Sequence, residues 1–498
     1  LQSKARLPGP FRTPLPVPPV LEPVRSEAGA DHYEMTQKVG KAEILPGLKT
    51  EVWGYDGIFP GPTVEARSGR RAVIRHRNEL PVPVSVHLHG GKTPPESDGY
   101  PTDLILPRSG QHGAPAHGAS AHGGSAGHGS GHHDPASEHV HVFKDYVYPN
   151  EQRGATLWYH DHRMDFTGPQ VWRGLAGLYI IRDDEEDALP LPSGEKDVPL
   201  VICDRSFDED GSFLYPSLDH SLMGRPGVER DYMDGVLGDV VLVNGAPWPY
   251  MDVSNTMYRF RILNASNARR YELALSPEPG DGASFVQVGS DGGLIGAPLS
   301  YRTIPIAQAE RFDVIVDFSK YEVGTNVTLK NRLGDGRTAD IMRFRVNRNE
   351  REESSVPRRL SDMTEFDALQ ESDATREREF RFSRVGDAGK VMWGINGEPF
   401  DPGRMDARPR LGSTEIWNLR VAPASHPVHL HLVHFKVLSR SGKKPLRKDA
   451  GWKDTVDLAS GEGARVLVRF DGYKGRYVFH CHNLEHEDMM MMANFEVV

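Results

Sequence analysis

Four pairs of histidines, each pair separated by one residue, constrain this chain more than any other feature. Each pair lies in a run of β-forming residues, as in VSVHLHGG and RYVFHCH. Side chains two residues apart lie on the same face of a strand, so the two histidines of a pair face one way. The pairs are His87-Leu88-His89, His160-Asp161-His162, His429-Leu430-His431 and His480-Cys481-His482. They predict a metal cluster built from segments near both ends of the chain.

The last pair belongs to the stretch HCHNLEHEDMMMM, residues 480–492. A cysteine thiolate, two imidazoles and a weak axial thioether form the ligand set of a blue-copper electron-transfer site. Cys481 stands between His480 and His482, so the two histidines must point away from a metal that the cysteine binds. The stretch therefore predicts two copper sites, joined through the backbone of three residues.

The chain has 498 residues, which exceeds one hydrophobic core and suits roughly three domains. Short β-rich runs such as RAVIRHRN and RFDVIVDF stand between turn residues, with 51 glycines and 38 prolines, so we expect an all-β chain. The net charge of −10 argues against nucleic acid or an anionic membrane as partner. No apolar run of about 18 residues occurs, so no transmembrane helix is expected.

A weak threefold repeat organises the sequence. GIFPGP at 57–62 is echoed by NGAPWP at 244–249 and NGEPF at 396–400, and each is followed by a strand. FVQVGSDGG in the second repeat is compared with VSVHLHGG in the first and PVHLHLVHF in the third. Since the second repeat lacks these histidines, the middle domain is interpreted as a spacer. The expected domains are residues 1–185, 186–346 and 378–498, with a connector at 347–377.

Residues 111–141 are rich in Gly, Ala, Ser and His and hold eight of the 22 histidines. Their low hydrophobicity predicts a mobile loop within the first domain. Two functions are left open for this loop: a solvated segment without a defined role, or weak capture of extra copper.

The chain resembles the multicopper oxidases over nearly its whole length. In detail it is similar to the bacterial spore-coat laccases, bilirubin oxidases and phenoxazinone synthases. The residues that carry this resemblance are SDGYP at 97–101, LWYHDHRM at 157–164, FRILNASNAR at 260–269, GSDGG at 289–293, WKDTV at 452–456 and HCHNLEHED at 480–488. The resemblance implies three cupredoxin-like Greek-key β-barrel domains and four copper ions: one type 1 copper in the third domain, one type 2 and two type 3.

The resemblance also assigns ligands. It implies that type 2 copper is bound by His87 and His429, and that the type 3 pair is bound by His89, His160, His162, His431, His480 and His482. The type 1 ligands would be His426, Cys481, His486 and an axial methionine. Residues 489–492 are all methionines, so four candidates exist for the axial ligand. In relatives the axial methionine lies ten residues after the cysteine, which favours Met491, and the other three would then pack in the strand.

The multicopper oxidases that this chain resembles reduce dioxygen to water, and this reaction consumes protons as well as electrons. Asp98 and Glu487 match two acidic residues that approach the cluster in relatives, and we expect an acid/base role for both. The alternatives are an ordinary turn aspartate and a solvated strand glutamate. Asp454 is expected to make a structural hydrogen bond. His434 is expected behind a ligand or at the surface, and His76 in solvent.

We expect oxidation of phenols and aromatic amines coupled to reduction of dioxygen to water, with the electron entering near His486, the most exposed type 1 ligand in relatives. The alternatives are oxidation of bilirubin, coupling of o-aminophenols and oxidation of cuprous ion. A copper-storing or electron-transfer protein without oxidase activity is disfavoured, because it would not need eight further histidines.

Oligomeric state is left open. The N-terminus, LQSKARLPGP, has no apolar signal core and leaves export undecided, with an extracellular or cell-envelope location favoured over the cytoplasm.

Overall fold

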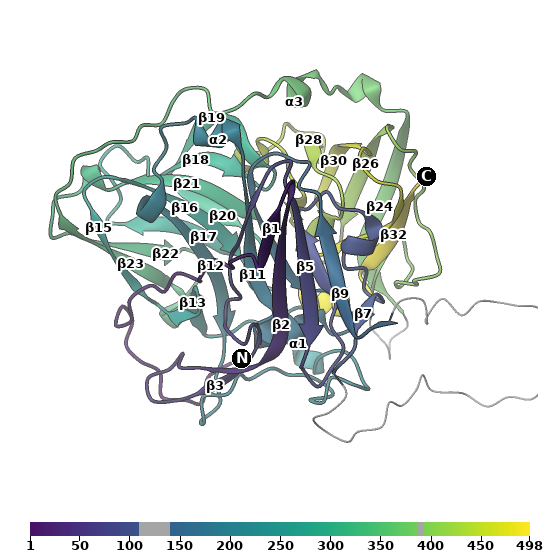
Figure 1. The fold of residues 1–498 in the computed structure, drawn as a ribbon, viewed down its shortest axis with the longest axis horizontal. Helices are drawn as coiled ribbons and strands as arrows, with labels where there is room; N and C mark the ends of the chain where they lie inside the picture. The colour runs from purple at the N-terminus through teal and green to yellow at the C-terminus, as the bar shows by residue number, and fades with distance from the viewer. Residues whose placement is uncertain (109–139, 387–391) are drawn as a thin grey trace, which may run out of the picture.

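The structure is a computed structural model that describes residues 1–108, 140–386 and 392–498. Strands dominate it, and the prediction of an all-β chain is confirmed (Figure 1). Three successive parts of the chain each form two principal β-sheets. The predicted His-rich loop lies outside the described residues, apart from its last two positions.

The first part, residues 25–182, has one sheet in the order β1-β2-β5-β9, with β3 on β2, and a second in the order β4-β11-β10-β6. β7 and β8 form a small additional ladder. Its strands are β1 (Arg25–Glu27), β2 (Ala30–Ala42), β3 (Thr50–Tyr55), β4 (Val64–Arg67), β5 (Arg71–Asn78), β6 (Val86–His89), β7 (Leu104–Ile105), β8 (Val140–His141), β9 (Phe143–Tyr148), β10 (Ala155–Asp161) and β11 (Ala176–Arg182).

The middle part, residues 197–348, has a seven-stranded sheet, β14-β13-β12-β16-β21-β18-β19, and a five-stranded one, β15-β23-β22-β17-β20. Its strands are β12 (Asp197–Arg205), β13 (Val240–Val243), β14 (Ala246–Pro247), β15 (Tyr250–Ser254), β16 (Met257–Asn264), β17 (Tyr271–Ser276), β18 (Phe285–Ser290), β19 (Gly293–Tyr301), β20 (Thr303–Ile306), β21 (Arg311–Asp317), β22 (Asn326–Asn331) and β23 (Asp340–Arg348).

The last part, residues 376–497, pairs the sheet β25-β24-β26-β30-β28 with the sheet β29-β27-β31-β32. Its strands are β24 (Arg376–Val385), β25 (Met392–Ile395), β26 (Thr414–Val421), β27 (His426–Leu430), β28 (Phe435–Arg440), β29 (Thr455–Leu458), β30 (Gly463–Arg469), β31 (Gly475–Cys481) and β32 (Met492–Val497). The α-helices of the described residues are short: α1 (Thr167–Arg173), α2 (Asp184–Asp187), α3 (Thr364–Ala368) and α4 (Leu484–Asp488).

Strand pairing repeats from one part to the next. β5, β16 and β26 occupy equivalent places: each pairs in parallel with an earlier strand (β2, β12, β24) and antiparallel with a later one (β9, β21, β30). The turns before them repeat too, since Asp56-Gly57, Asn244-Gly245 and Asn396-Gly397 all have positive φ at both residues. Such turns favour Asn or Asp followed by Gly. The threefold repeat therefore has a structural basis.

One equivalence inferred from the sequence is wrong. FVQVGSDGG forms β18, which pairs with β21 as β28 pairs with β30. The strand that follows β16, as β6 follows β5 and β27 follows β26, is β17. Apolar alternation alone could not separate these two candidates. The place of the histidines in the middle domain is thus taken by β17, whose sequence is YELALS.

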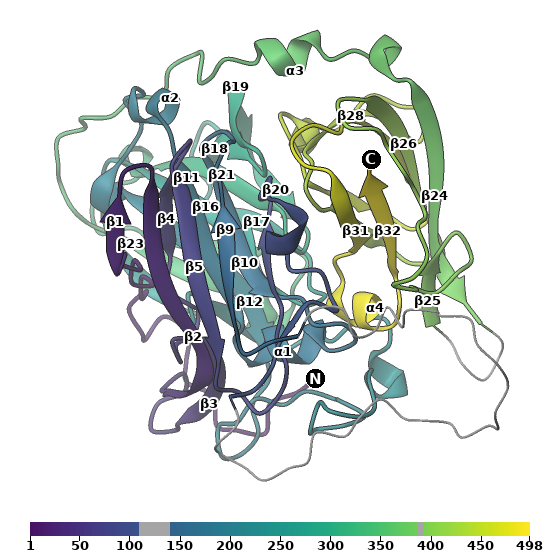
Figure 2. The same ribbon diagram turned by 45° about the vertical axis from the view of Figure 1, so that its right-hand side comes forward.

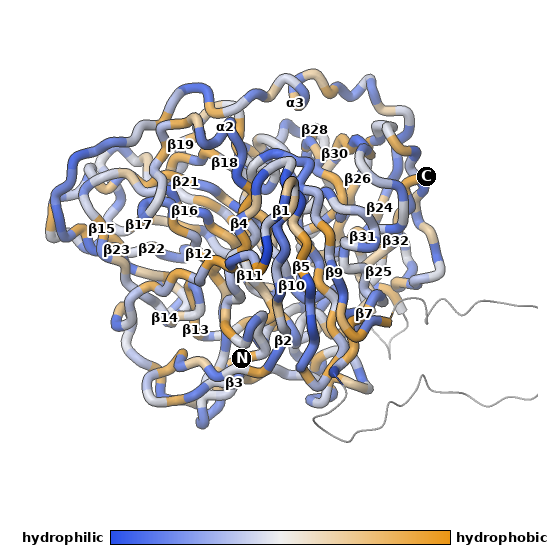
Figure 3. The backbone as a smooth tube through the Cα atoms, in the orientation of Figure 1, coloured by the Kyte–Doolittle hydropathy of each residue, from blue (hydrophilic) through white to orange (hydrophobic). Residues whose placement is uncertain are grey.

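The cores differ in how far they extend. Apolar side chains of the first part, including Trp158 and Leu178, share one cluster with those of the middle part, such as Leu200 and Phe312. The last part has its own cluster around Cys481. Figure 3 shows the alternation of apolar and polar residues along the strands that builds these cores.

The chain between β23 and β24 carries α3 and runs along the top of Figure 1, from the middle part to the last. Lys436 anchors it by donating to the carbonyl oxygens of Phe366, at 2.9 Å, and Leu369, at 3.1 Å. The predicted domain boundaries and the connector at 347–377 stay predictions. Within the described ranges, no helix combines the length and apolar character needed to cross a bilayer.

Candidate metal centre

Strand pairing brings the eight paired histidines together. β6 pairs antiparallel with β10, so His87 lies opposite His160, and β27 pairs with β31, so His429 lies opposite His480. The last domain lies beside the first, so these two sheets meet (Figure 2). All eight side chains are at most 1% exposed. The predicted convergence of four distant motifs is therefore present in the structure.

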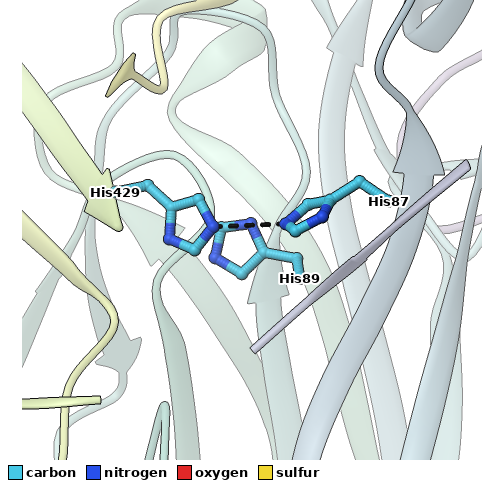
Figure 4. A group of neighbouring side chains, drawn as sticks. All are labelled: His87, His89 and His429. Atoms are coloured by element: carbon cyan, nitrogen blue, oxygen red, sulfur yellow. Dashed lines mark hydrogen bonds between the residues drawn. The ribbon is translucent and has the colours of Figure 1, made fainter. Parts of the chain in front are cut away.

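The eight rings form three groups of three, with His89 shared by two of them. Within each group one ring nitrogen per residue lies within 4.8 Å of the others. Figure 4 shows the group in which His429, from the last domain, faces His87 and His89, from the first. The groups are His87, His89 and His429; His89, His160 and His482; and His162, His431 and His480.

Hydrogen bonds at the outer nitrogens fix how these rings point. His87 Nδ1 donates to the Asp98 carbonyl oxygen at 2.7 Å, and His429 Nδ1 donates to the Asp454 carbonyl oxygen at 2.9 Å. Each ring then presents an unprotonated Nε2, and the two Nε2 atoms lie 3.3 Å apart. Two lone pairs facing each other repel, whereas a cation between them is attracted to both. This arrangement fits a bound metal ion.

The remaining rings follow the same logic. His431 Nδ1 donates to Asp98 Oδ2 at 2.7 Å, which leaves its Nε2 3.2 Å from His480 Nε2. His160 Nδ1 donates to the Asp161 carbonyl oxygen, and its Nε2 is buried without a protein partner. His89 is reversed: Nε2 donates to Asp454 Oδ1 at 3.0 Å, and Nδ1 is the buried nitrogen without a partner. Buried nitrogens without partners are costly unless a ligand satisfies them.

Six of the eight rings are held in the neutral form that binds a cation. Burial lowers the pKa well below the ordinary value at His89, His160, His162, His429, His431 and His482. His480 is different: burial lowers its pKa, but the Glu487 carboxylate outweighs this and raises it.

A second site lies on the opposite side of β31. Cys481 Sγ lies 3.3 Å from His426 Nδ1 and 3.7 Å from His486 Nδ1, and the two Nδ1 atoms are 3.0 Å apart. All three side chains are buried. Burial raises the pKa of the Cys481 thiol, so the thiol keeps its proton until a metal ion displaces it. One sulfur and two imidazole nitrogens at these distances fit the predicted blue-copper set.

The four methionines separate into different environments. Met491 is fully buried in the same apolar cluster as Cys481, whereas Met492 packs in another cluster with Tyr100. Met489 and Met490 are only partly buried. The Cys481 N–H donates to the Met491 carbonyl oxygen at 3.1 Å, which places the two residues side by side. This placement favours Met491 as the axial ligand.

His486 is less accessible than expected. It is 1% exposed, and the indole of Trp393 lies over it with ring centroids 4.0 Å apart. The middle domain contributes to the cover, because Asn483 Nδ2 donates to the Asp234 carbonyl oxygen at 3.1 Å. Nothing in the HCHNLEHED motif indicates Trp393, which lies 93 residues earlier in the sequence. An electron donor must therefore approach His486 from outside this cover.

Both expected acid/base residues are buried beside the histidines. Glu487 Oε2 lies 3.1 Å from His480 Nδ1, and its Oε1 accepts from Thr167 Oγ1 at 3.0 Å. Asp98 is fully buried and bonds His431. Glu487 belongs to the short helix α4 and is 4% exposed, so the alternative of a solvated strand glutamate is wrong.

Asp454 makes the structural hydrogen bonds expected of it, and they connect to the cluster. Its carboxylate accepts from His89 and also from Arg311, to which the sequence alone assigned no role. Burial would raise the pKa of Asp454, but the adjacent Arg311 guanidinium holds it well below the usual range. A charged residue at the start of the apolar run RFDVIVDF was the available signal for Arg311.

Two further histidines, His434 and His76, lie outside the proposed ligand set and in different environments. His434 lies behind the cluster, where Nε2 donates to the Gly90 carbonyl oxygen at 3.1 Å, in agreement with one of its two expected places. The expectation that His76 is solvent-exposed is wrong. It is 1% exposed and bonds Gln37 Nε2 at 2.6 Å. The alternation in RAVIRHRN places it on the inward face with Ile74, a signal that was available.

Comparison with known proteins agrees with this geometry. Sequence models described as multicopper oxidase match residues 36–113, 111–186 and 363–498. A laccase of Bacillus subtilis (strain 168) is 36% identical, with 98% of each chain covered. A bilirubin oxidase of Albifimbria verrucaria is 34% identical over 97% of this chain and 81% of its own length.

Among solved structures, a multi-copper oxidase from Pediococcus acidilactici superposes with a TM-score of 0.81 at 31% identity, covering 100% of this chain and 93% of its own. The predictions of cupredoxin-like domains and of four bound copper ions are confirmed by this kinship and by the histidine groups. The chain belongs to the multicopper oxidase family.

Proposed function

We propose that this protein is a laccase-like oxidase that removes single electrons from phenols and aromatic amines and reduces dioxygen to water. The observation that carries the proposal is the division of labour along β31. Cys481 belongs to the triplet with His426 and His486, while its neighbours His480 and His482 each belong to a different group of the histidine cluster. Three consecutive residues thus connect one single-electron site to both halves of a dioxygen site.

We assign the ligands as follows. His426, Cys481, His486 and Met491 would hold the type 1 copper. His87 and His429 would hold the type 2 copper. The type 3 pair would be held by His89, His160 and His482 on one side and by His162, His431 and His480 on the other. Bound copper would supply one-electron redox chemistry beside Cys481 and four-electron reduction of dioxygen at the cluster.

We assign proton transfer at the cluster to two carboxylates, Glu487 and Asp98. Glu487 reaches His480 with one oxygen, and with the other it accepts from Thr167, so it lies between the cluster and the N-terminus of α1. Asp98 contacts two other rings, since it bonds His431 and lies 3.5 Å from His87 Nδ1. A carboxylate that can hold and release a proton at these places acts as a general acid.

Reductant selectivity follows from the cover over His486. Trp393 lies against this ring and both are only 1% exposed, so the donor is oxidised across this cover without binding a ligand directly. Contact of this kind places few demands on donor shape. We therefore expect broad specificity for small aromatic reductants.

Oxygen uptake by the copper-loaded protein tests the proposal. The panel is 2,6-dimethoxyphenol, bilirubin, o-aminophenol and cuprous ion, with copper-loaded Cys481→Ser as the control. We expect rapid uptake with the phenol and none above background with the control. Uptake with cuprous ion alone, or with no donor, would contradict the proposed substrate class.

A further inference from the structure

The middle domain supplies no histidine to the copper sites described above, yet one of its side chains reaches them. Arg311, the first residue of β21, is 1% exposed. All five of its N–H donors have partners. Nε donates to the Thr156 carbonyl oxygen of the first domain at 2.9 Å. Two more bonds go to the middle domain's own carbonyl oxygens, at Ala309 and Asp291.

The remaining two donors form a fork on a carboxylate of the last domain. Nη1 donates to Asp454 Oδ1 at 2.9 Å and Nη2 to Asp454 Oδ2 at 2.5 Å. One guanidinium therefore bonds all three domains at once. Two parallel bonds to a carboxylate restrict its rotation as well as its position.

Asp454 is in turn bonded to two predicted copper ligands. Its Oδ1 accepts from His89 Nε2, and its main-chain carbonyl oxygen accepts from His429 Nδ1. These bonds decide which nitrogen of each ring faces the cluster: Nδ1 for His89 and Nε2 for His429. The two rings stack with centroids 3.6 Å apart, so a turn of one displaces the other.

The surroundings leave this assembly little freedom. Asp291 Oδ2 accepts from the N–H groups of Asp454 and Thr455, both at 3.2 Å. Gly90, the residue after His89, has φ +91°, and a Cβ there would lie 2.8 Å from Arg311 Nη2. The turn that carries His89 is thus packed directly against the guanidinium.

We propose that Arg311 is a positioning residue, through which the middle domain holds Asp454 and thereby fixes the orientation of His89 and His429 at the copper cluster. The middle domain is then part of the site and more than a spacer. This inference rests on the copper assignment proposed above. It predicts that the shape of the guanidinium, and not only its charge, controls the cluster at His89, a proposed type 3 ligand, and, through the stacked ring of His429, at the type 2 copper.

Arg311→Lys tests the proposal, because lysine keeps the charge but cannot form the fork. The control is Arg261→Lys in the neighbouring strand β16. Arg261 is equally buried, bonds Asp197 and Glu186, and also reaches Thr156. None of these partners bonds a copper-site histidine in the described structure. Both variants therefore lose a buried guanidinium at the boundary with the first domain.

We expect copper-loaded Arg311→Lys to show an altered type 2 electron paramagnetic resonance signal, or less copper at that site, with normal blue absorption. Its kcat should fall by about 10- to 100-fold, the usual effect of losing an outer hydrogen bond to a metal ligand, with KM for the reductant unchanged. Arg261→Lys should keep the wild-type signal.

An Arg311→Lys signal and copper content equal to those of Arg261→Lys would overturn the proposal while leaving the proposed function intact. Wild-type protein that holds fewer than four copper ions would instead overturn the proposed function. If Arg311→Lys does not fold, Asp291→Asn is measured in its place, since Asp291 holds the main chain of Asp454 and is the middle domain's other side-chain contact to it. An altered type 2 signal then supports the positioning role, and an unchanged one refutes it.

Discussion

The two copper regions are built in opposite ways. The proposed type 1 ligands all come from one domain. His426 and Cys481 lie in paired strands of one sheet, and Met491 lies directly before β32 in the same apolar cluster as Cys481. The eight-histidine cluster is split between two domains and clamped by a third. The first site therefore depends on local strand register, and the second on how domains pack. Substitutions that disturb one should leave the other measurable.

Cys481→Ser should have the largest effect. Without the thiolate, the blue absorption disappears and oxidation of every reductant falls to the no-enzyme level, while the protein still holds three copper ions at the cluster. Copper analysis and oxygen uptake check this. Cys203→Ala is the matched control, because Cys203 is equally buried but packs in the core between the first and middle domains. Loss of cluster copper in Cys481→Ser would show that the two sites are not separable.

Glu487→Gln should slow turnover by about 10²- to 10⁴-fold, the usual contribution of a positioned acid. Reduction of the type 1 site by substrate without oxygen should stay at the wild-type rate, since the change lies on the cluster side. Stopped-flow absorption of the blue band separates the two steps. Glu485→Gln is the control: burial raises the pKa of Glu485, and its partners are Tyr215, Asn267 and Val236. Equal slowing of both steps in Glu487→Gln would remove its assigned role.

Asp454→Asn should cost about 10- to 100-fold in turnover or in copper affinity at the cluster, because an amide has a single acceptor oxygen and presents its NH2 group either to His89 or to Arg311, which are both donors. Blue absorption should persist. Metal analysis and the type 2 resonance signal check this. Asp449→Asn, another buried carboxylate of the last domain that binds Arg440, provides the comparison. The same spectrum from both variants would argue against a specific link between Asp454 and the cluster.

Met491→Leu should change the reduction potential of the type 1 site. Its effect on turnover should be much smaller than the orders of magnitude expected for the substitutions above. Removing a weak axial thioether raises the reduction potential of a blue site and preserves its colour. Redox titration of the blue band measures this. Met490→Leu should leave the potential unchanged, because Met490 packs with Tyr100 outside the Cys481 cluster. A rise in Met490→Leu instead would shift the ligand register by one.

The smallest effect concerns stability away from both sites. Burial lowers the pKa of His76 from 6.5 to about 3. The folded state thus binds this proton less readily than the unfolded state does. The contribution of the neutral ring to the free energy of unfolding is therefore fully present above pH 6.5 and is lost as the pH falls toward 3. In His76→Gln, the decline of the unfolding free energy with acid should be shallower by up to about 1.4 kcal/mol per pH unit. Chemical denaturation of the copper-free protein between these limits measures it, and an unchanged slope would contradict the buried, neutral ring.

The convergence of the eight paired histidines was predictable because a period of two residues fixes which side chains share a strand face. The repeat likewise indicated three similar domains, and the Asp-Gly and Asn-Gly turns bear it out. The contacts between domains were not predictable in this way. Arg311 and Trp393 act across long sequence separations, and no local pattern records which carboxylate or which imidazole they meet.

The ring orientations also needed the structure. Sequence assigns His89 to the cluster, but only its bond to Asp454 shows that Nδ1, and not Nε2, faces inward. His76 teaches the opposite lesson, since the alternation of its strand already placed it inside. Treating a lone histidine as a surface residue was the error.

The central claim is that a one-electron site feeds a four-electron cluster in one chain. Measuring copper content together with the ratio of donor oxidised to dioxygen consumed tests this most directly. The predicted result is four copper ions per chain, four one-electron donors oxidised per dioxygen, and water as the product. One or two copper ions per chain, or hydrogen peroxide formed with two donors per dioxygen, would contradict it.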